Sequence, residues 1–215
     1  MKSSLSNQKN QIQLKFEDRK FLIRLLQKKD IEELEILDDM LFEVHYNERD
    51  HEEMITSRYF SIGLFDVTTP ESKLIGVSTS SREWRNFYSA ERDAYLATFG
   101  IHPDYRKMKL GTYLLLVTCQ ALKKFYGCNV LTLHMLKSNR AAFYFYQNNN
   151  FLFVKSLPRY YHFQNQRHDA LFLIKYLDTF QFTPLPSNIT IDSTIQPYLE
   201  TTQRHCCCSR YFSDP

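Results

Sequence analysis

The stretch from Asp93 to Phe151 most limits what this chain can fold into, because its residues alternate between strand and helix patterns. Residues 94–101 are β-branched, aromatic or apolar, and they predict a strand that ends at the following His-Pro pair. Residues 110–126 predict a helix, and residues 130–136 predict a second strand. A second helix is expected after Ser138, a favourable N-cap residue. The residues therefore predict strand, turn, helix, strand and helix in succession.

The turn between the first strand and the first helix is basic. Arg106, Lys107 and Lys109 stand where the helix begins, and a helix N-terminus already carries partial positive charge and unpaired N–H groups. Three cations are unfavourable there unless an anion binds, and helix N-termini are ready sites for phosphate groups. Gly111 would let the backbone come close to such a ligand. The alternative is a solvated basic turn whose side chains point at water.

The elements around this stretch are predicted from local patterns. Asp30 is expected to cap a helix as the first member of a capping box with Glu33. A short polar helix is expected over residues 52–58. The remaining strands are expected at residues 21–26, 59–67, 74–81, 151–156 and 170–176. The apolar face of the helix over residues 110–126 comprises Leu110, Leu114, Leu115, Leu122 and Phe125.

The composition narrows the class of protein. The chain has 215 residues, of which 43% are apolar, so we expect one domain with a real core and with extensions. Its net charge of +3 is too small to indicate a nucleic-acid binder. The five cysteines form no C-x-x-C pair, which argues against a zinc site and against a disulfide framework. The polar N-terminal residues predict no secretory signal, and the sequence contains no run of roughly 18 apolar residues. We therefore expect a cytosolic or nuclear protein whose membrane contacts are peripheral.

The two ends of the chain differ from its middle. Residues 1–20 are polar and are expected to be disordered, residues 21–177 to form the domain, and residues 178–215 to form a flexible tail. The tail contains Cys206-Cys207-Cys208, a plausible S-acylation site. The alternative is an inert tail.

Two motifs in the organising stretch resemble one family. Arg106-x-x-Lys109-x-Gly111 resembles the Q/R-x-x-G-x-G/A acetyl-CoA signature of the GCN5-related N-acetyltransferases, with Lys109 in place of the first glycine. Asn139-x-x-Ala142-x-x-x-Tyr146 resembles the second signature of this family. The two motifs occur in the family's order and at its usual separation, and each follows a predicted strand. The resemblance extends over residues 21–177.

Further motifs narrow the resemblance to N-terminal acetyltransferases of the NatE and NatF type. Phe42-Glu43-Val44-His45-Tyr46 resembles their F-P-[IV]-x-Y loop. Leu133-His134-Met135 resembles the Leu-His-Val strand of the NatF type, and Leu157-Pro158-Arg159-Tyr160-Tyr161 resembles its Leu-Pro-Tyr-Tyr-Tyr hairpin. The implied fold is the mixed α/β acetyltransferase fold, a twisted mixed central β-sheet flanked by helices on both faces.

The resemblance implies acetyl-CoA as the cofactor. The backbone of Phe99, Gly100 and Ile101 would pair with its pantetheine arm, as an added strand does. Asn139 would bond the cofactor or the adjacent backbone, and Tyr146 would reach the thiol as it leaves, unless Tyr146 only packs within its aromatic helix. The pyrophosphate would lie on the amides of Arg106, Lys107, Met108, Lys109, Leu110, Gly111 and Thr112.

The resemblance also implies the catalytic pair. Tyr95 and His134 would remove the proton of the substrate's α-amine through water. That amine has a pKa of about 8, so the base need only act as the attack proceeds. Histidine titrates in the right range, whereas tyrosine, with a pKa of about 10, is better suited to positioning a water molecule. The alternative for His134 is a satisfied core histidine.

The acceptor is expected between two aromatic segments. Phe42, Val44 and Tyr46 would line the pocket for the first residue, and His45 stands where NatF-type enzymes have a glutamate. Tyr160 and Tyr161 would cover the entrance, which favours N-terminal amines over lysine side chains. The alternatives are ordinary core aromatics in the loop and a hairpin without a ligand.

The resulting hypothesis is acetyl transfer to the N-terminal amine of proteins, with Met-hydrophobic or Met-Lys starts. Protein N-terminal peptides would be the partners, with no nucleic acid, and a monomer is favoured. Other acceptors remain open: histone or other lysine side chains, or a small amine. A silent scaffold of the same fold is the alternative from another class, because of Lys109 and His45. The NatF resemblance adds possible association with the cytosolic face of the Golgi membrane through the tail.

Overall fold

The computed structural model describes residues 18–43, 46–56, 58–84, 92–177 and 184–199. They form one eight-stranded mixed sheet in the order β6-β7-β5-β4-β3-β2-β1-β8. The strands are β1 (Phe21–Leu25), β2 (Tyr59–Asp66), β3 (Lys73–Trp84), β4 (Arg92–Ile101), β5 (Val130–Leu136), β6 (Leu152–Phe163), β7 (Gln166–Tyr176) and β8 (Ile189–Ile191). The helices are η1 (Lys28–Asp30), α2 (Ile31–Leu41), α3 (Glu48–Met54), η2 (Pro103–Tyr105), α4 (Leu110–Lys124), α5 (Arg140–Asn148) and α6 (Gln196–Leu199), η1 and η2 being short 3-10 helices.

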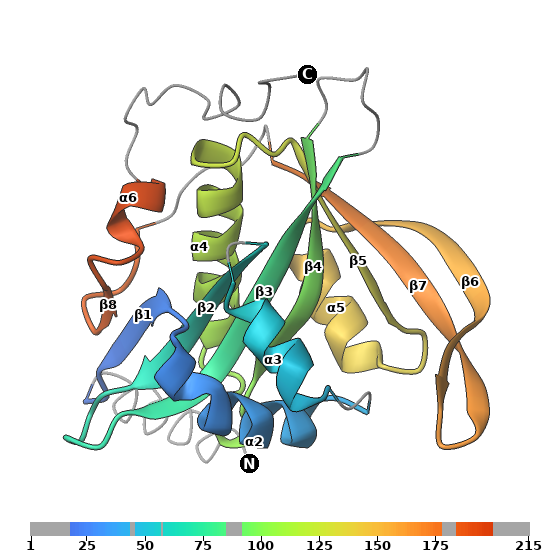
Figure 1. Cartoon of the computed structure of the whole chain (residues 1–215). Helices are drawn as coiled ribbons and strands as arrows, with labels where there is room; N and C mark the ends of the chain where they lie inside the picture. Colours follow the sequence, from blue (N-terminus) through green and yellow to red (C-terminus); the bar gives the residue numbers. More distant parts are fainter. Residues whose placement is uncertain (1–17, 44–45, 57, 85–91, 178–183, 200–215) are drawn as a thin grey trace, which may run out of the picture.

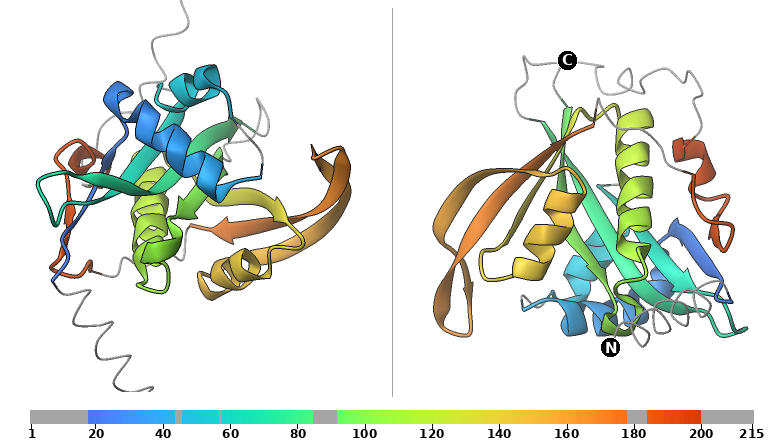
Figure 2. Two further views of the ribbon diagram at one scale, coloured as in Figure 1. Left: turned by 90° about the horizontal axis from the view of Figure 1, so that it is seen from below. Right: turned by 180° about the vertical axis from the view of Figure 1, so that it is seen from behind.

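Helices cover both faces of this sheet. Figure 2 shows α2 and α3 on one face and α4 and α5 on the other. The β6–β7 hairpin extends beyond the rest of the sheet (Figure 1). The predicted mixed α/β fold is therefore confirmed, and so are the strands, with β3 and the β6–β7 hairpin longer than expected. None of the helices in the described parts of the chain is long and apolar enough to cross a bilayer.

Helix α4 supplies much of the core, because its apolar face packs on the centre of the sheet. Leu110 and Leu114 are buried against strand residues such as Ile62 and Leu64. Burial of each such side chain contributes about 1.5–3 kcal/mol. Leu115 and Leu122 are also buried, as predicted.

Phe125 was expected on the same face, and that prediction was wrong. Its side chain is 51% exposed and packs on Tyr198 of α6, with ring centroids 4.3 Å apart. Phe125 is the C-cap residue of α4 and keeps helical backbone angles, but α6 rather than the sheet packs against its ring.

The expected flexible tail contains folded structure in its first half. Strand β8 pairs in parallel with β1, and Figure 1 shows α6 beside α4. Ile189, Ile195 and Leu199 are buried in the main core. Single apolar residues in a polar segment gave no periodic signal, which explains the misplaced boundary. Cys206-Cys207-Cys208 lies outside the described residues.

Three helix starts differ from the prediction. Asn139, not Ser138, caps α5, and its side chain accepts a hydrogen bond from the amide of Ala142 at 3.0 Å. Asp30 does not cap α2 through its side chain, because its carboxylate pairs with Arg24. Helix α3 begins at Glu48 rather than at residue 52, because Asn47 forms a capping box with Asp50.

Glu33 also has a different partner from the expected one. Its carboxylate accepts a hydrogen bond from the backbone amide of Leu74 at 2.7 Å. A helix side chain that bonds a strand amide in this way fixes α2 on β3. The sequence contains the local capping motif, but Asp30 and Glu33 instead bind Arg24 and the amide of Leu74.

The centre of the sheet opens between β4 and β5. These parallel strands pair only from Asp93 to Tyr95, opposite residues 130–132. Strand β4 carries a bulge at Ala97, where its register with β3 shifts, and a bulge increases the local twist. Strand β5 continues beside β7 instead. The two central strands therefore diverge from Leu96 onward.

Candidate active site

Because the two strands diverge, the edge of β4 that faces β5 has no strand partner from Leu96 to Ile101. Phe99, Gly100 and Ile101, the predicted pantetheine partners, all lie on this part of β4, whose ladder partner there is β3 alone. The Ile101 carbonyl accepts a hydrogen bond from Nε of Arg106 at 3.0 Å. The ring of Phe99 stacks on Phe145 of α5, with centroids 5.5 Å apart. An edge of unpaired backbone next to an apolar wall is suited to an extended amide-containing ligand.

The basic turn starts α4 in an unusual conformation. Lys107 and Lys109 both have positive φ angles, 64° and 61°, and no side chain caps the helix at Lys109. A left-handed conformation costs a residue with a side chain about 1–2 kcal/mol. The side chains of Arg106, Lys107 and Lys109 are exposed. The turn thus presents backbone N–H groups and three cations at a helix N-terminus, where anions are favoured.

Gly111 has a packing role. A Cβ atom at this position would lie 3.3 Å from the ring of Phe145 and 3.4 Å from Ile101. The missing side chain therefore lets the first turn of α4 pack closely on α5 and β4. Met108 is half-buried, as is Thr112, and Leu110 is buried.

The second signature residues lie on α5. Asn139 bonds the adjacent backbone, as its capping role requires. Tyr146 is 7% exposed and packs against Phe99, Phe145 and Phe151. Burial, and then the neighbouring Tyr95, raise the pKa of the Tyr146 phenol above its usual range. Tyr146 therefore stays protonated and able to donate a hydrogen bond.

His134 lies where the two central strands separate. The last residue of β5 that pairs with β4 is Thr132, and His134 lies two positions after it. Its Nδ1 lies 3.3 Å from the hydroxyl of Tyr95 and 3.3 Å from the hydroxyl of Tyr160. Because one ring nitrogen makes one hydrogen bond at a time, these hydroxyls are alternative partners. Three groups that can bind or transfer a proton thus meet at one point.

The surroundings of His134 favour its neutral form. The imidazole is stacked on Tyr160 and on Phe172, with centroids 4.6 Å and 4.9 Å apart. Burial, and secondarily the charge of Lys155, lower the pKa of His134. A neutral imidazole at neutral pH is a proton acceptor. Lys155 and Phe172 were missed by the sequence reasoning, because only the pairing register of β6, β7 and β5 brings them to His134.

The β6–β7 hairpin brings further tyrosines to this point. Tyr160 is exposed on the hairpin, and Tyr161 is half-buried. Burial, and then Tyr95, Tyr160, Tyr46 and Tyr146, raise the pKa of Tyr161 above its usual range. The ring of Tyr161 packs edge-on against the ring of Tyr160, with centroids 5.0 Å apart, and Tyr160 stacks on His134. The hairpin and β5 thus meet at His134.

The loop after α2 and the hairpin also touch directly. The amide of Gln164, in the hairpin turn, donates a hydrogen bond to the carboxylate of Glu43 at 3.3 Å. Phe42 is half-buried and packs on the cluster under α2. Val44 and His45, two of the predicted peptide contacts, lie outside the described residues. Of the predicted loop residues, the structure thus places Phe42 and Tyr46.

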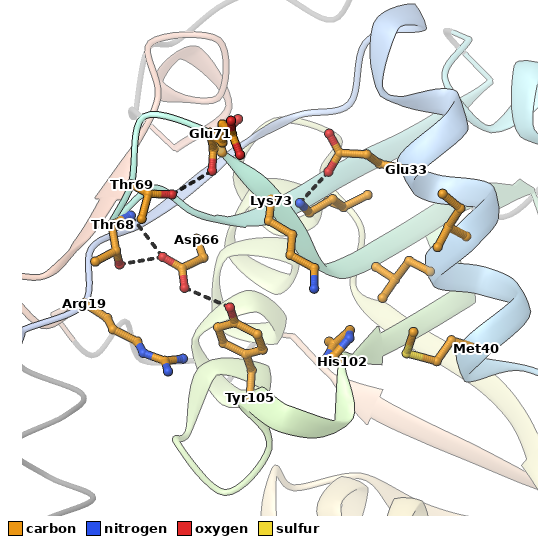
Figure 3. A pocket seen from close by; sticks show the side chains of 14 residues that line it. Arg19, Glu33, Met40, Asp66, Thr68, Thr69, Glu71, Lys73, His102 and Tyr105 are labelled. Atoms are coloured by element: carbon orange, nitrogen blue, oxygen red, sulfur yellow. Dashed lines mark hydrogen bonds between the residues drawn. The ribbon is translucent and has the colours of Figure 1, made fainter.

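A separate pocket of about 690 Å³ lies between α2, the β2–β3 turn and η2 (Figure 3). None of the predicted site residues lines it. At one side the hydroxyl of Tyr105 donates to Asp66 at 2.9 Å. Its lining is Arg19, Glu33, Ile36, Leu37, Met40, Asp66, Thr68, Thr69, Glu71, Ser72, Lys73, Leu74, His102 and Tyr105. The pocket mixes charges of both signs and holds no proton-transfer cluster like that at His134.

Known proteins share this sequence pattern and this fold. Residues 29–151 match the model of the acetyltransferase (GNAT) family. Over 91 residues the chain is 32% identical to N-alpha-acetyltransferase 60 of Xenopus tropicalis. The matched segment covers 40% of this chain and 36% of that protein. The chain thus spans about a third of the length of this curated relative.

Two solved structures of Arabidopsis thaliana NAA60 have a similar fold. The complex with a bisubstrate analogue gives a TM-score of 0.67 at 20% identity, over 73% of this chain and 97% of that chain. The complex with acetyl-CoA gives a TM-score of 0.66 at 19% identity, over 73% and 98%. The family model covers more than half of the chain, and its matched segment contains the diverging strands and the basic turn. This chain therefore belongs to the acetyltransferase (GNAT) family.

Proposed function

We propose that this chain transfers the acetyl group of acetyl-CoA to the N-terminal amine of proteins. The observation that carries the proposal is the meeting of the Tyr95 and Tyr160 hydroxyls at His134 Nδ1. Tyr95 belongs to the strand whose edge is open, and Tyr160 belongs to the hairpin opposite the loop after α2. A proton acceptor is thus shared between a cofactor side and an acceptor side.

The residues present fit the cofactor. The open edge of β4 at Phe99, Gly100 and Ile101 suits the two amides of pantetheine, and the start of α4 with Lys107 and Lys109 suits the pyrophosphate. Arg106 would turn from the Ile101 carbonyl toward the phosphates. Bound acetyl-CoA supplies an activated thioester, so no covalent enzyme intermediate is needed when the amine is held close to it.

His134 acts as the general base in this proposal. Its neutral imidazole receives the proton that the α-amine loses as nitrogen attacks the acetyl carbon, directly or through a water held by Tyr95. The carbon–nitrogen bond forms and the carbon–sulfur bond breaks. Tyr146, kept protonated by burial, donates a hydrogen bond to the departing sulfur. The proton of the amine and the charge on the departing sulfur thus each face a group able to compensate them.

The acceptor side favours a chain end over an internal lysine. The Glu43–Gln164 contact joins the two segments on either side of the entrance, and Tyr160 and Tyr161 narrow it. The end of an extended chain can enter such a closed passage. An internal lysine would have to bring in the peptide chain on both sides of it through the same opening. Phe42 and Tyr46 supply apolar surface for a first residue such as methionine. The comparison with N-alpha-acetyltransferase 60 supports this choice.

A peptide panel tests the proposal. Labelled acetyl-CoA is supplied with peptides that begin Met-Leu, Met-Lys or Ser-Gly, and with N-blocked copies that carry one internal lysine. We expect label on the free Met-starting peptides and none on the blocked ones. Label on the blocked peptides would establish a lysine acetyltransferase instead. No transfer by folded protein, together with no binding of acetyl-CoA, would establish the silent scaffold.

A further inference from the structure

A buried acidic and basic pair joins α2 to α3. Oδ2 of Asp38, in the last turns of α2, lies 3.1 Å from Nε2 of His51, in α3. Each residue is only 2% exposed. On the other side of the ring, Glu35 places a carboxylate oxygen 3.7 Å from Nδ1 of His51. The segment between Asp38 and His51 contains the loop that carries Phe42 and Tyr46.

Stability does not explain this pair. A buried ion pair is often replaced by apolar residues of similar volume without loss of stability, because removing charges from water is costly. Burial raises the pKa of the Asp38 carboxyl to about 6 in spite of His51, so its charged form is disfavoured in the fold. The second carboxylate oxygen, Oδ1, has no hydrogen-bond partner in the described part of the chain. The pair is therefore retained at a cost to the fold.

The pair adjoins both ends of the loop. At the first end, the amide of Phe42 donates to the backbone carbonyl of Asp38 at 2.9 Å, the last hydrogen bond of α2, so the carboxylate acts on Phe42 only by fixing the end of this helix. At the second end, the ring of Tyr46 packs edge-on against the ring of His51, with centroids 6.1 Å apart. The charge of Asp38 also contributes to the raised pKa of Tyr46, after burial. The loop that carries Tyr46 reaches the hairpin through the hydrogen bond between Gln164 and Glu43.

We propose that Asp38 and His51 are positioning residues for the acceptor: their contact fixes α3 against α2 and so holds Phe42 and Tyr46 against the incoming peptide end. This inference rests on the proposed function, because it takes a peptide to be the acceptor. The hydrogen bond from imidazole to carboxylate is directional, so it fixes the rotation of the His51 ring on which Tyr46 packs. Two apolar residues would fill the same space but would form no directional hydrogen bond and would give Tyr46 no oriented ring to pack on.

Kinetics with two substrates test the inference. Asp38→Asn should raise the KM for a Met-starting peptide about tenfold, since small misplacements of binding groups have effects of this size, while the KM for acetyl-CoA stays unchanged. Glu32→Gln, an exposed carboxylate on the same helix, is the matched control and should change neither constant. Equal losses toward both substrates, or an unchanged peptide KM, would overturn the inference.

A second variant separates positioning from folding. The double replacement of Asp38 and His51 by leucine should unfold at the same temperature as the wild type or higher, and should still show the raised peptide KM. A normal peptide KM in this stable variant would overturn the inference, because apolar filling would then suffice.

Hydrogen exchange gives a readout that does not require activity. In Asp38→Asn the amides of Phe42 and His51, which donate to the carbonyls of Asp38 and Asn47 on either side of the loop, should exchange about tenfold faster, because the loop opens more often. The amides of the β6–β7 hairpin should exchange as in the wild type. If the wild type acetylates no peptide, the proposed function fails, while this experiment still tests the positioning of the loop. Unchanged exchange at Phe42 and His51 would refute the positioning itself.

Discussion

The two sides of the site at His134 are built from different materials. The proposed cofactor side consists mainly of backbone: the open edge of β4 and the first amides of α4. The proposed acceptor side consists of side chains: Phe42, Tyr46, Tyr160 and Tyr161 belong to a loop and a hairpin far apart in sequence. Backbone groups are the same in every residue, so we expect the cofactor side to tolerate a change such as Lys109 for glycine. The acceptor side changes with each substitution, and it is where acceptor preference should be set.

The largest expected effect comes where the two sides meet. His134→Ala removes the proton acceptor, so kcat should fall roughly 100-fold or more, while the affinity for acetyl-CoA stays the same. Steady-state rates and calorimetric titration measure the two quantities. His162→Ala is the control, because His162 is an exposed histidine on the neighbouring β6–β7 hairpin. A wild-type kcat in His134→Ala would show that another group accepts the proton.

A charge reversal on the cofactor side should have the next largest effect. Lys107→Glu places a carboxylate beside the expected pyrophosphate, which should weaken acetyl-CoA binding about tenfold at low salt and less at high salt. The peptide KM should not change. Lys73→Glu, with the same charge change at the start of β3, should leave the affinity for acetyl-CoA unaltered. An unaffected affinity in Lys107→Glu at low salt would contradict the placement of the pyrophosphate.

A smaller effect is expected in the pH dependence. Because burial and Lys155 lower the pKa of His134, the neutral base persists to a lower pH than for a free histidine. His134 should therefore contribute an acid limb below about pH 6.5, separate from the limb at about pH 8 that protonation of the peptide's own amine contributes. Lys155→Gln removes the second cause, so the acid limb of kcat/KM should move to higher pH. If the acid limb does not move in Lys155→Gln, the group that titrates in it is not His134.

The smallest effect concerns the conformation of Lys109. Its φ of 61° suits glycine, whose larger unfolded-state entropy offsets part of the gain, so Lys109→Gly should raise the free energy of unfolding by about 0.5–1 kcal/mol. Lys109→Val should lower it, since β-branched residues tolerate this region least. Urea unfolding measures both. If Lys109→Gly lowers the free energy of unfolding, the turn does not have the left-handed conformation.

The same contrast explains how much the sequence could predict. The expected cofactor side lies within one continuous stretch, so the family motifs could point to the basic turn, to Asn139 and to Phe99. The family resemblance also implied the pair of Tyr95 and His134, and the structure places the hydroxyl of Tyr95 3.3 Å from Nδ1 of His134. Lys155, Phe172 and the Glu43–Gln164 contact depend on strand register and on the length of the β6–β7 hairpin, which local patterns do not specify.

Buried partners outside regular patterns were missed for a related reason. The Asp38–His51 pair joins two helices, and a lone histidine on a short polar helix gives no signal in sequence. Strand β8 and α6 were assigned to the tail because Ile189 and Ile195 are isolated apolar residues. In both cases the docking of a short element on an existing surface determined the structure.

The most direct test of the central claim uses one peptide with two competing amines. The peptide begins with a free Met-Leu N-terminus and contains an internal lysine, and fragmentation mass spectrometry locates the acetyl group after limited turnover. If the acceptor side admits only chain ends, the acetyl group will be on the N-terminal amine and the lysine will be unmodified. Acetylation of the lysine at a comparable rate would contradict the account, because the Glu43–Gln164 contact and the tyrosine hairpin would then not close the entrance.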